Sequence, residues 1–283
     1  MFFHDDKLQF EVRVERPNPL FAKMLQQAIG GVEGEIRVCL QYLFQAWGAR
    51  GPKKYRDMLL ETGTEEIGHI EMLATAVALN LQNAPLEMQE AAANGNPMIN
   101  AVLGGMSPRH VLSTALAAMP IDSNGVPFDC SHIYASGNLA ADMYANVTAE
   151  STGRMLAVSL FNMTDDPGMK HMLSYMIARD TMHQNQWLAV IEEIGGEKVH
   201  PIPNSFPREM ENEEYSYAFM STMRDSSVKP PQGRWTSGKS NDGRGKYSTT
   251  QQPSYSVPDI GPALPKAGAQ QEQVEATSNG ASR

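Results

Sequence analysis

Four stretches of the chain repeat apolar side chains at steps of three and four residues, and each runs for about thirty residues. They cover residues 20–47, 53–80, 133–163 and 167–194. Helices of that length are about 40–45 Å long at ~1.5 Å per residue and bury their apolar stripes by packing side by side. The sequence therefore predicts an all-α fold, a four-helix bundle.

Connections between these stretches predict how the helices are joined. The first and third connections are short, which predicts two antiparallel pairs, whereas about fifty residues join the second helix to the third and predict a crossover. Asp165 or Asp166 is a suitable N-cap for the fourth helix, with Pro167 at its first position. Ser107 and Pro108 open a short helix predicted over 107–118.

The ends of the chain differ in composition from the bundle. Residues 1–18 alternate and then meet two prolines, which predicts an extended N-terminal arm. The bundle is predicted over 19–200. Residues 201–283 form a predicted extended tail, rich in Pro, Gly and Ser after about 226, which would wrap neighbouring subunits.

Charge and hydropathy exclude several classes of protein. The net charge of −9 argues against nucleic-acid binding, which requires a basic face. No apolar run approaches the roughly 20 residues of a membrane helix, and the N-terminus lacks the apolar core of a signal peptide. Cys39 and Cys130 are too few for a disulfide framework, and we expect both reduced and buried. We predict a cytoplasmic protein.

Each predicted helix carries one carboxylate within its apolar stripe. These acids are Glu35, Glu66, Glu150 and Asp180, in chain order. In the second and fourth helices the acid precedes a histidine by three residues, as Glu66-x-x-His69 and Asp180-x-x-His183. The stripes are Ala28, Val32, Glu35, Cys39, Tyr42, Ala46; Tyr55, Leu59, Thr62, Glu66, His69, Leu73, Ala76; Leu139, Met143, Asn146, Glu150, Gly153, Ala157, Leu160; and Leu173, Met176, Asp180, His183, Trp187, Val190 or Ile191, Ile194.

Four buried acids require compensating positive charge. Burying one unpaired carboxylate costs several kcal/mol, and no Lys or Arg occupies the four stripes. Side chains three residues apart lie about 5–6 Å apart at Cβ, so a Glu and a His can reach one ion. One such pair occurs often by chance, but two of them with two lone acids indicate a site for two divalent metals. The alternative is a plain bundle with protonated or surface carboxylates.

Asp180 is one methylene shorter than a glutamate, so the predicted ligands are the other five side chains: Glu35, Glu66, His69, Glu150 and His183. Asp180 would lie just beyond the metals, where it could hold a proton. Tyr42 shares the stripe of Glu35 and could hydrogen-bond a ligand, or be a packed core tyrosine. Glu65 flanks the stripe. We expect the remaining histidines at the surface or in caps: His4, His110, His132, His171 and His200.

Four long motifs give the chain a family resemblance. They are "GGVEGEIRVCLQYLFQAW", "KYRDMLLETGTEEIGHIEML", "ASGNLAADMYANVTAEST" and "MLSYMIARDTMHQNQW". Over about residues 1–225 the chain resembles the non-haem manganese catalases. The resemblance implies a ferritin-like bundle and a homohexamer. It also implies that two manganese ions per subunit convert two hydrogen peroxide molecules to two water and dioxygen, cycling between Mn(II)2 and Mn(III)2.

Carried over by motif, the resemblance implies that Glu35, Glu66, His69, Glu150 and His183 bind manganese. It places Tyr42 beside the ligands and Asp180 where some members handle protons with a glutamate. Some members have an arginine where this chain has Ala149, which puts solvent access in doubt. Some members also bind calcium through acids like Asp57 and Glu61, which otherwise are a solvated face.

Two other functions fit the same residues. Carboxylate and imidazole ligands suit iron as well as manganese, so a di-iron oxidase or peroxidase is one alternative. A non-catalytic iron-storage or structural shell protein is the other. Metal identity with dioxygen release tests the first, and assembly size tests the second.

Overall fold

The fold is described from a computed structural model, which covers residues 6–82, 105, 107–195, 207–222, 227–254, 256 and 258. The chain divides into two compact units, Met1–Glu211 with Asn241–Arg244, and Asn212–Ser240 with Gly245–Arg283. Within the described residues, no helix is both long and apolar enough to cross a membrane.

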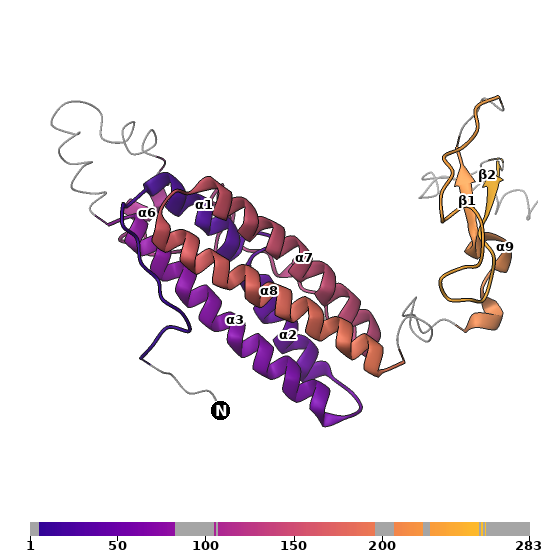
Figure 1. Ribbon diagram of the computed structural model, residues 1–283, viewed down its shortest axis with the longest axis horizontal. Helices are drawn as coiled ribbons and strands as arrows, with labels where there is room; N and C mark the ends of the chain where they lie inside the picture. The colour runs from indigo at the N-terminus through magenta and orange to yellow at the C-terminus, as the bar shows by residue number, and fades with distance from the viewer. Residues whose placement is uncertain are drawn as a thin grey trace, which may run out of the picture. The chain divides into compact units, whose positions relative to one another are not determined.

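The first unit is a bundle of helices, as predicted (Figure 1). Helix α3 packs against α1 and α2, and α7 packs along α8. Residues 83–104, the middle of the predicted crossover, lie outside the described residues. The main helices are α1 (Pro19–Gly30), α2 (Glu35–Gly48), α3 (Lys53–Asn80), α7 (Leu139–Met163) and α8 (Pro167–Glu193).

The predicted single helix over 20–47 is wrong, because the chain breaks between α1 and α2. A Cβ atom at Gly30 would lie 2.4 Å from the backbone nitrogen of Ile121, and one at Gly34 would lie 2.7 Å from the carbonyl oxygen of Ile29. The glycines allow these close backbone contacts and a turn over 31–34. Val32, predicted to face inward, lies in this turn and is exposed.

A loop from α6 (Pro108–Leu112) onward packs against α1 through one buried side chain. The Gln26 amide donates to the carbonyl oxygen of Met119 at 2.7 Å and accepts from the Met119 N–H at 2.9 Å. Nε2 of His110 lies 3.3 Å from the Gln26 side-chain oxygen. His110 is thus buried rather than a surface or capping group, and α6 ends six residues before the predicted end.

The start of α7 also differs from the prediction. The helix begins at Leu139 rather than near residue 133, because the Asn138 side chain caps it by accepting from the Ala141 N–H at 3.1 Å. A short 3₁₀ turn, η1 (Cys130–His132), precedes it, and Cys130 is exposed there rather than buried. The prediction for Cys39 is confirmed: it is buried.

Two apolar clusters fill the bundle, one toward each end of the long helices. The first includes Leu25, Leu73 and Met172, and the second includes Leu59 and Trp187. Along α3 and α8, the acids and histidines of the stripes fall between the residues of the two clusters. The polar site is therefore enclosed by apolar packing on both sides.

The N-terminal arm lies along the outside of α3 and α8. The Phe10 ring stacks on Tyr175 with 4.3 Å between ring centroids, and the Gln9 amide donates to the carbonyl oxygen of Glu65 at 2.8 Å. Asp166 fixes the end of the arm by accepting from the N–H groups of Glu15 and Arg16 at 2.8 and 3.0 Å.

Asp166, one of the two predicted caps, also caps α8 by accepting from the Met169 N–H at 3.1 Å. Asp166→Ala is expected to lower the free energy of unfolding by about 1–2 kcal/mol, because a helix cap and two further hydrogen bonds are lost. Urea unfolding measures this loss, and Asp165→Ala, an exposed neighbour, is the control. An equal effect of the two changes would contradict the prediction.

That contribution should depend on pH. Burial favours the neutral acid, but hydrogen bonds from the backbone outweigh it and hold the pKa of Asp166 below its usual value. A depressed folded-state pKa stabilises the protein above the unfolded-state pKa. The difference between wild type and Asp166→Ala should therefore shrink as the pH falls through the folded-state pKa.

The second unit contains a small sheet that the sequence analysis does not predict. Strands β1 (Ala218–Ser221) and β2 (Ser248–Gln251) pair in parallel, with Ala218 opposite Ser248. Helix α9 (Glu213–Ser216) directly precedes β1, and η2 (Arg208–Met210) lies at the end of the first unit.

Candidate metal centre

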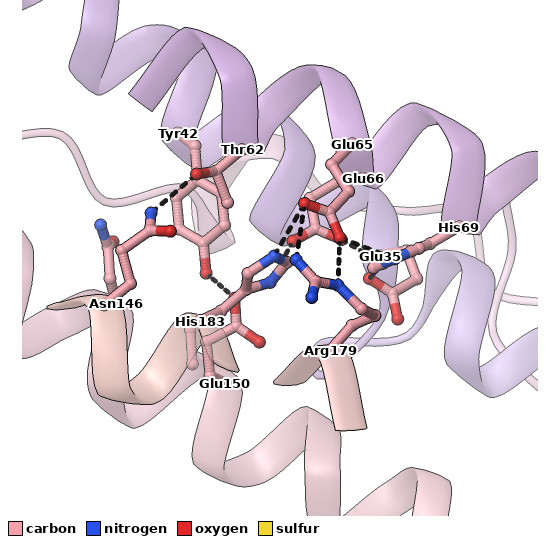
Figure 2. Close-up of polar contacts among 12 residues, drawn as sticks. Glu35, Tyr42, Thr62, Glu65, Glu66, His69, Asn146, Glu150, Arg179 and His183 are labelled. Carbon is pink, nitrogen blue, oxygen red and sulfur yellow. Dashed lines mark hydrogen bonds and ion pairs between the residues drawn. The ribbon is translucent and has the colours of Figure 1, made fainter. Parts of the chain in front are cut away.

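Four helices each bring polar side chains to one enclosed site (Figure 2). Glu35 lies in the first turn of α2, Glu66 and His69 lie on α3, Glu150 on α7 and His183 on α8. All but Glu35 are fully buried, and the Glu35 side chain is 13% exposed. The structure thus brings together the five side chains that the sequence predicts as metal ligands.

Hydrogen bonds between helices fix the register around these side chains. Gln41 and Gln45 on α2 each donate to the Asn146 side-chain oxygen on α7 at 2.8 Å, one turn before Glu150. Gln186 on α8 donates to the Thr62 hydroxyl on α3 at 2.8 Å, one turn before Glu66. Buried polar contacts of this kind hold facing helices in one alignment.

The Glu66 carboxylate lies between the two imidazoles. Its Oε2 atom is 2.6 Å from Nδ1 of His69, and its Oε1 atom is 3.0 Å from Nδ1 of His183. A carboxylate that presents one oxygen to each side can bridge two ions.

Each imidazole also meets a second carboxylate. Nδ1 of His69 lies 3.8 Å from Glu35 Oε2, and Nδ1 of His183 lies 3.3 Å from Glu150 Oε1. Glu35, Glu66 and His69 therefore form one group, and Glu66, Glu150 and His183 form another, each with ligand atoms within 4.8 Å of one another. The two groups share Glu66.

The donor atoms of this site fit metal ions. Within the described residues, the Glu66 oxygens and the ring nitrogens of His69 and His183 are buried without a hydrogen bond of acceptable geometry. Such groups are normally paired or bound to a metal. Carboxylate and imidazole are ligands for divalent manganese or iron. Two ions would satisfy the Glu66 oxygens and the Nδ1 atoms of both imidazoles.

The acids and histidines compensate one another electrostatically when no ion is bound. Burial and the charge of Glu66 raise the pKa of Glu35, and burial raises the pKa of Glu150. Burial lowers the pKa of His183, but contacts with Glu150, Glu65 and Glu66 outweigh it and raise the pKa to about 12. Metal binding would replace these protons, because ligands bind in their deprotonated forms.

Tyr42 is completely buried and donates a short hydrogen bond from its hydroxyl to Glu150 Oε1. Its ring packs against Trp187 with 4.9 Å between centroids. Burial and the charge of Glu150 raise the pKa of Tyr42 well above its usual value, so the phenol keeps its proton and remains a donor. Tyr42 thus has both predicted kinds of contact: it hydrogen-bonds a predicted ligand and packs in the core.

Asp180 is buried but belongs to neither group of ligand atoms. Burial and the charges of Glu35, Glu150 and Glu66 raise its pKa to about 9. With no ion bound, burial and the neighbouring acids thus favour the neutral form of Asp180. Ala149, directly before Glu150, is also buried and packs in the apolar cluster with Trp187.

Two residues of this site, Glu65 and Arg179, were not predicted from the apolar stripes of the helices. The Glu65 oxygens lie 3.6 Å from Nε2 of His69 and 3.3 Å from Nε2 of His183. Burial would raise the pKa of Glu65, but these imidazoles and Arg179 hold it well below its usual value. Glu65 directly precedes Glu66, and Arg179 directly precedes Asp180. Their position next to a predicted site residue was the signal in the sequence that could have found them.

The two acids predicted for calcium lie apart from this site. The Asp57 carboxylate accepts from the Lys53 ammonium at 2.7 Å and contacts Arg56, and Glu61 is exposed. Neither belongs to a group of three potential metal ligands in the parts of the chain that the structure describes.

The chain is similar to known proteins in both sequence and structure. The family model of manganese-containing catalases matches residues 1–275. A manganese catalase from Bacillus subtilis (strain 168) is 46% identical over 266 residues, covering 94% of this chain and 96% of that protein. One from Lactiplantibacillus plantarum is 37% identical over 220 residues, covering 78% and 82%.

A crystal structure of a manganese catalase from Anabaena PCC7120 has a TM-score of 0.69 at 20% identity, and the match covers 89% of this chain and all of that one. At that identity the likeness supports the shared fold. The matches of sequence and of fold both extend over most of the chain, so this protein belongs to the family of manganese-containing catalases.

Proposed function

We propose that this chain disproportionates two hydrogen peroxide molecules to two water molecules and dioxygen at a centre of two manganese ions. Glu35, Glu66 and His69 would hold one ion, and Glu66, Glu150 and His183 the other. The observation that carries this proposal is the shared Glu66, whose two oxygens face the two imidazoles separately. When bound, the manganese pair supplies the two-electron change that reduces one peroxide and oxidises the next.

In this reaction the side chains of the protein would supply and accept protons. Reduction of one peroxide consumes two protons, and oxidation of the second releases two. Asp180 is placed to hold a proton between these steps, because it is buried beside the acids of the site and belongs to neither ligand group. The Tyr42 hydroxyl, through its hydrogen bond, would keep the Glu150 carboxylate oriented.

Metal analysis together with oxygen evolution tests the proposed function. The purified protein should contain two manganese ions per chain by mass spectrometry and should release one dioxygen for every two peroxides consumed. A chain that binds iron and consumes peroxide without dioxygen would instead be an oxidase or peroxidase. A chain that binds no metal would overturn the proposal.

Asp180→Asn is expected to reduce the rate of dioxygen release by about 10²–10⁴-fold, because the amide cannot transfer the proton. The manganese content should remain that of wild type, since Asp180 lies outside both ligand groups. Oxygen-electrode rates normalised to bound manganese measure the effect. Asp165→Asn, at an exposed position two residues before α8, is the control. An unchanged rate would remove Asp180 from the proposed mechanism.

Three further expectations stay predictions. A calcium ion at Asp57 and Glu61 would have to displace the contact of Asp57 with Lys53. A homohexamer would be recognised by its mass in solution. A cytoplasmic location would be tested by cell fractionation.

A further inference from the structure

We propose that Glu65 and Arg179 form an outer clamp that positions both imidazoles of the metal centre. This inference rests on the proposed function, because the clamp would act on the ligands of the proposed ions. In this proposal Glu65 and Arg179 orient the metal ligands and do not bind the metal themselves. Figure 2 shows Glu65 and Arg179 beside His69 and His183, with dashed lines from the Glu65 carboxylate to both imidazoles and to Arg179.

Glu65 contacts the two histidines at the ring nitrogens that Glu66 does not contact. Its Oε1 atom lies 3.6 Å from Nε2 of His69, and its Oε2 atom lies 3.3 Å from Nε2 of His183. The Glu66 oxygens face Nδ1 of the same two rings. Consecutive glutamates on α3 therefore enclose both imidazoles, with the ligand groups on the Nδ1 side and Glu65 on the Nε2 side.

This geometry argues against Glu65 as a ligand and for Glu65 as an orienting group. An imidazole that binds a metal through Nδ1 carries its proton on Nε2. A carboxylate that accepts this proton fixes the tautomer and the ring orientation, and it makes the ligand nitrogen more basic. Because Glu65 presents a separate oxygen to each ring, one side chain would orient the ligands of both ions.

Arg179 holds this carboxylate with two hydrogen bonds. Its Nε atom donates to Oε1 at 2.6 Å, and one terminal nitrogen donates to Oε2 at 3.2 Å. A guanidinium matches the plane of a carboxylate in this paired arrangement, whereas a lysine ammonium does not. The Glu65 oxygens are therefore shared between Arg179 on one side and the imidazoles on the other.

The N-terminal arm covers the same part of α3. The Gln9 side-chain amide donates to the Glu65 carbonyl oxygen at 2.8 Å. A Cβ atom at Gly68 would lie 2.1 Å from the Gln9 amide nitrogen, so the glycine makes room for this contact. The backbone that carries Glu65 is thus fixed from outside the bundle.

The competing explanation is an ordinary surface ion pair. The Glu65 and Arg179 side chains are 24% and 32% exposed, and such pairs often contribute about 0–1 kcal/mol to stability and nothing to function. A surface pair would leave metal binding unchanged when it is broken. The clamp predicts that metal binding changes even where folding does not.

Glu65→Gln tests the clamp, because glutamine has the same shape and only one acceptor oxygen. One imidazole would still face an oxygen, while the other would face an amide N–H₂ group. Manganese affinity, measured by equilibrium dialysis of the full-length protein, should fall by about 10–100-fold. The electron paramagnetic resonance spectrum of the bound Mn(II) pair should change as well. Glu71→Gln makes the same charge change on an exposed face of α3 and should bind manganese like wild type.

Arg179→Lys is the second variant, since it keeps the charge and loses the paired hydrogen bonds. It should lower the manganese affinity in the same direction as Glu65→Gln, and the two effects together should be smaller than their sum. Wild-type affinity and an unchanged spectrum in both variants would overturn the clamp alone. A wild-type chain that binds no manganese would overturn the proposed function and the clamp with it.

Discussion

Glu66→Gln is expected to abolish dioxygen release and to prevent binding of the manganese pair. Both proposed ligand groups contain Glu66, so one substitution removes the negative charge that the two ions would share and replaces one of the two oxygen ligands by an amide NH₂ group, which does not bind a cation. Substituting a residue that only contacts a metal ligand already lowers metal affinity by about 10–100-fold. Substituting Glu66 should therefore lower manganese affinity by at least about a hundredfold. Dialysis against Mn(II) and oxygen evolution measure the two effects.

His183→Ala separates a shared ligand from an unshared one. It removes an imidazole from only one group, so it should lower the binding affinity for one ion more than for the other. Glu71→Gln, on the same helix as Glu66, again serves as the control for charge. If Glu66→Gln retained both ions and His183→Ala lost both, the assignment of Glu66 as the bridging ligand would be wrong.

Trp187→Ala is expected to cause the largest loss of stability. Its side chain is 0% exposed and packs against Tyr42 in the apolar cluster next to the metal site. Truncating a buried aromatic side chain to alanine costs about 3–5 kcal/mol, because packing is lost and a cavity remains. At about 2–4 °C per kcal/mol for a protein of 150–250 residues, the melting temperature should fall by about 6–20 °C.

The measurement requires a chelator, because bound metal stabilises the folded state and would mask part of the loss. Leu188→Ala is the matched control: the next residue on α8 is 49% exposed, and its truncation should change the free energy of unfolding by less than about 0.5 kcal/mol. Equal melting temperatures for the two variants would show that the cluster around Trp187 does not support the bundle.

Most of the helical framework follows from the sequence. Helix α3 was predicted with the observed bounds, and Pro167 marks the start of α8 in the sequence and in the structure, where Asp166 rather than Asp165 is the cap. A helix stripe is a local property, because residues three and four apart share one face whatever packs against it. Periodicity alone therefore places Glu66, His69 and His183 on buried faces.

The turn after Gly30 and the burial of His110 depend on contacts between residues far apart in the sequence, which local sequence patterns do not reveal. The turn after Gly30 exists where the backbone of Ile121 comes close, about ninety residues later in the chain. His110 is buried because Gln26, on a different helix, lies beside it. Neither the turn nor the burial of His110 follows from the residues on either side.

By itself, the sequence predicted which residue types form the site, because each of four apolar stripes carries one acid, and in two of them a histidine follows the acid three residues later. Only the tertiary structure decided how the acids divide their roles. Glu65 and Glu66 are adjacent and chemically identical, and a helix turns about 100° between them. That rotation places Glu66 at Nδ1 of both imidazoles and Glu65 at Nε2, beside Arg179. The distinction requires His183, which reaches the same point from another helix.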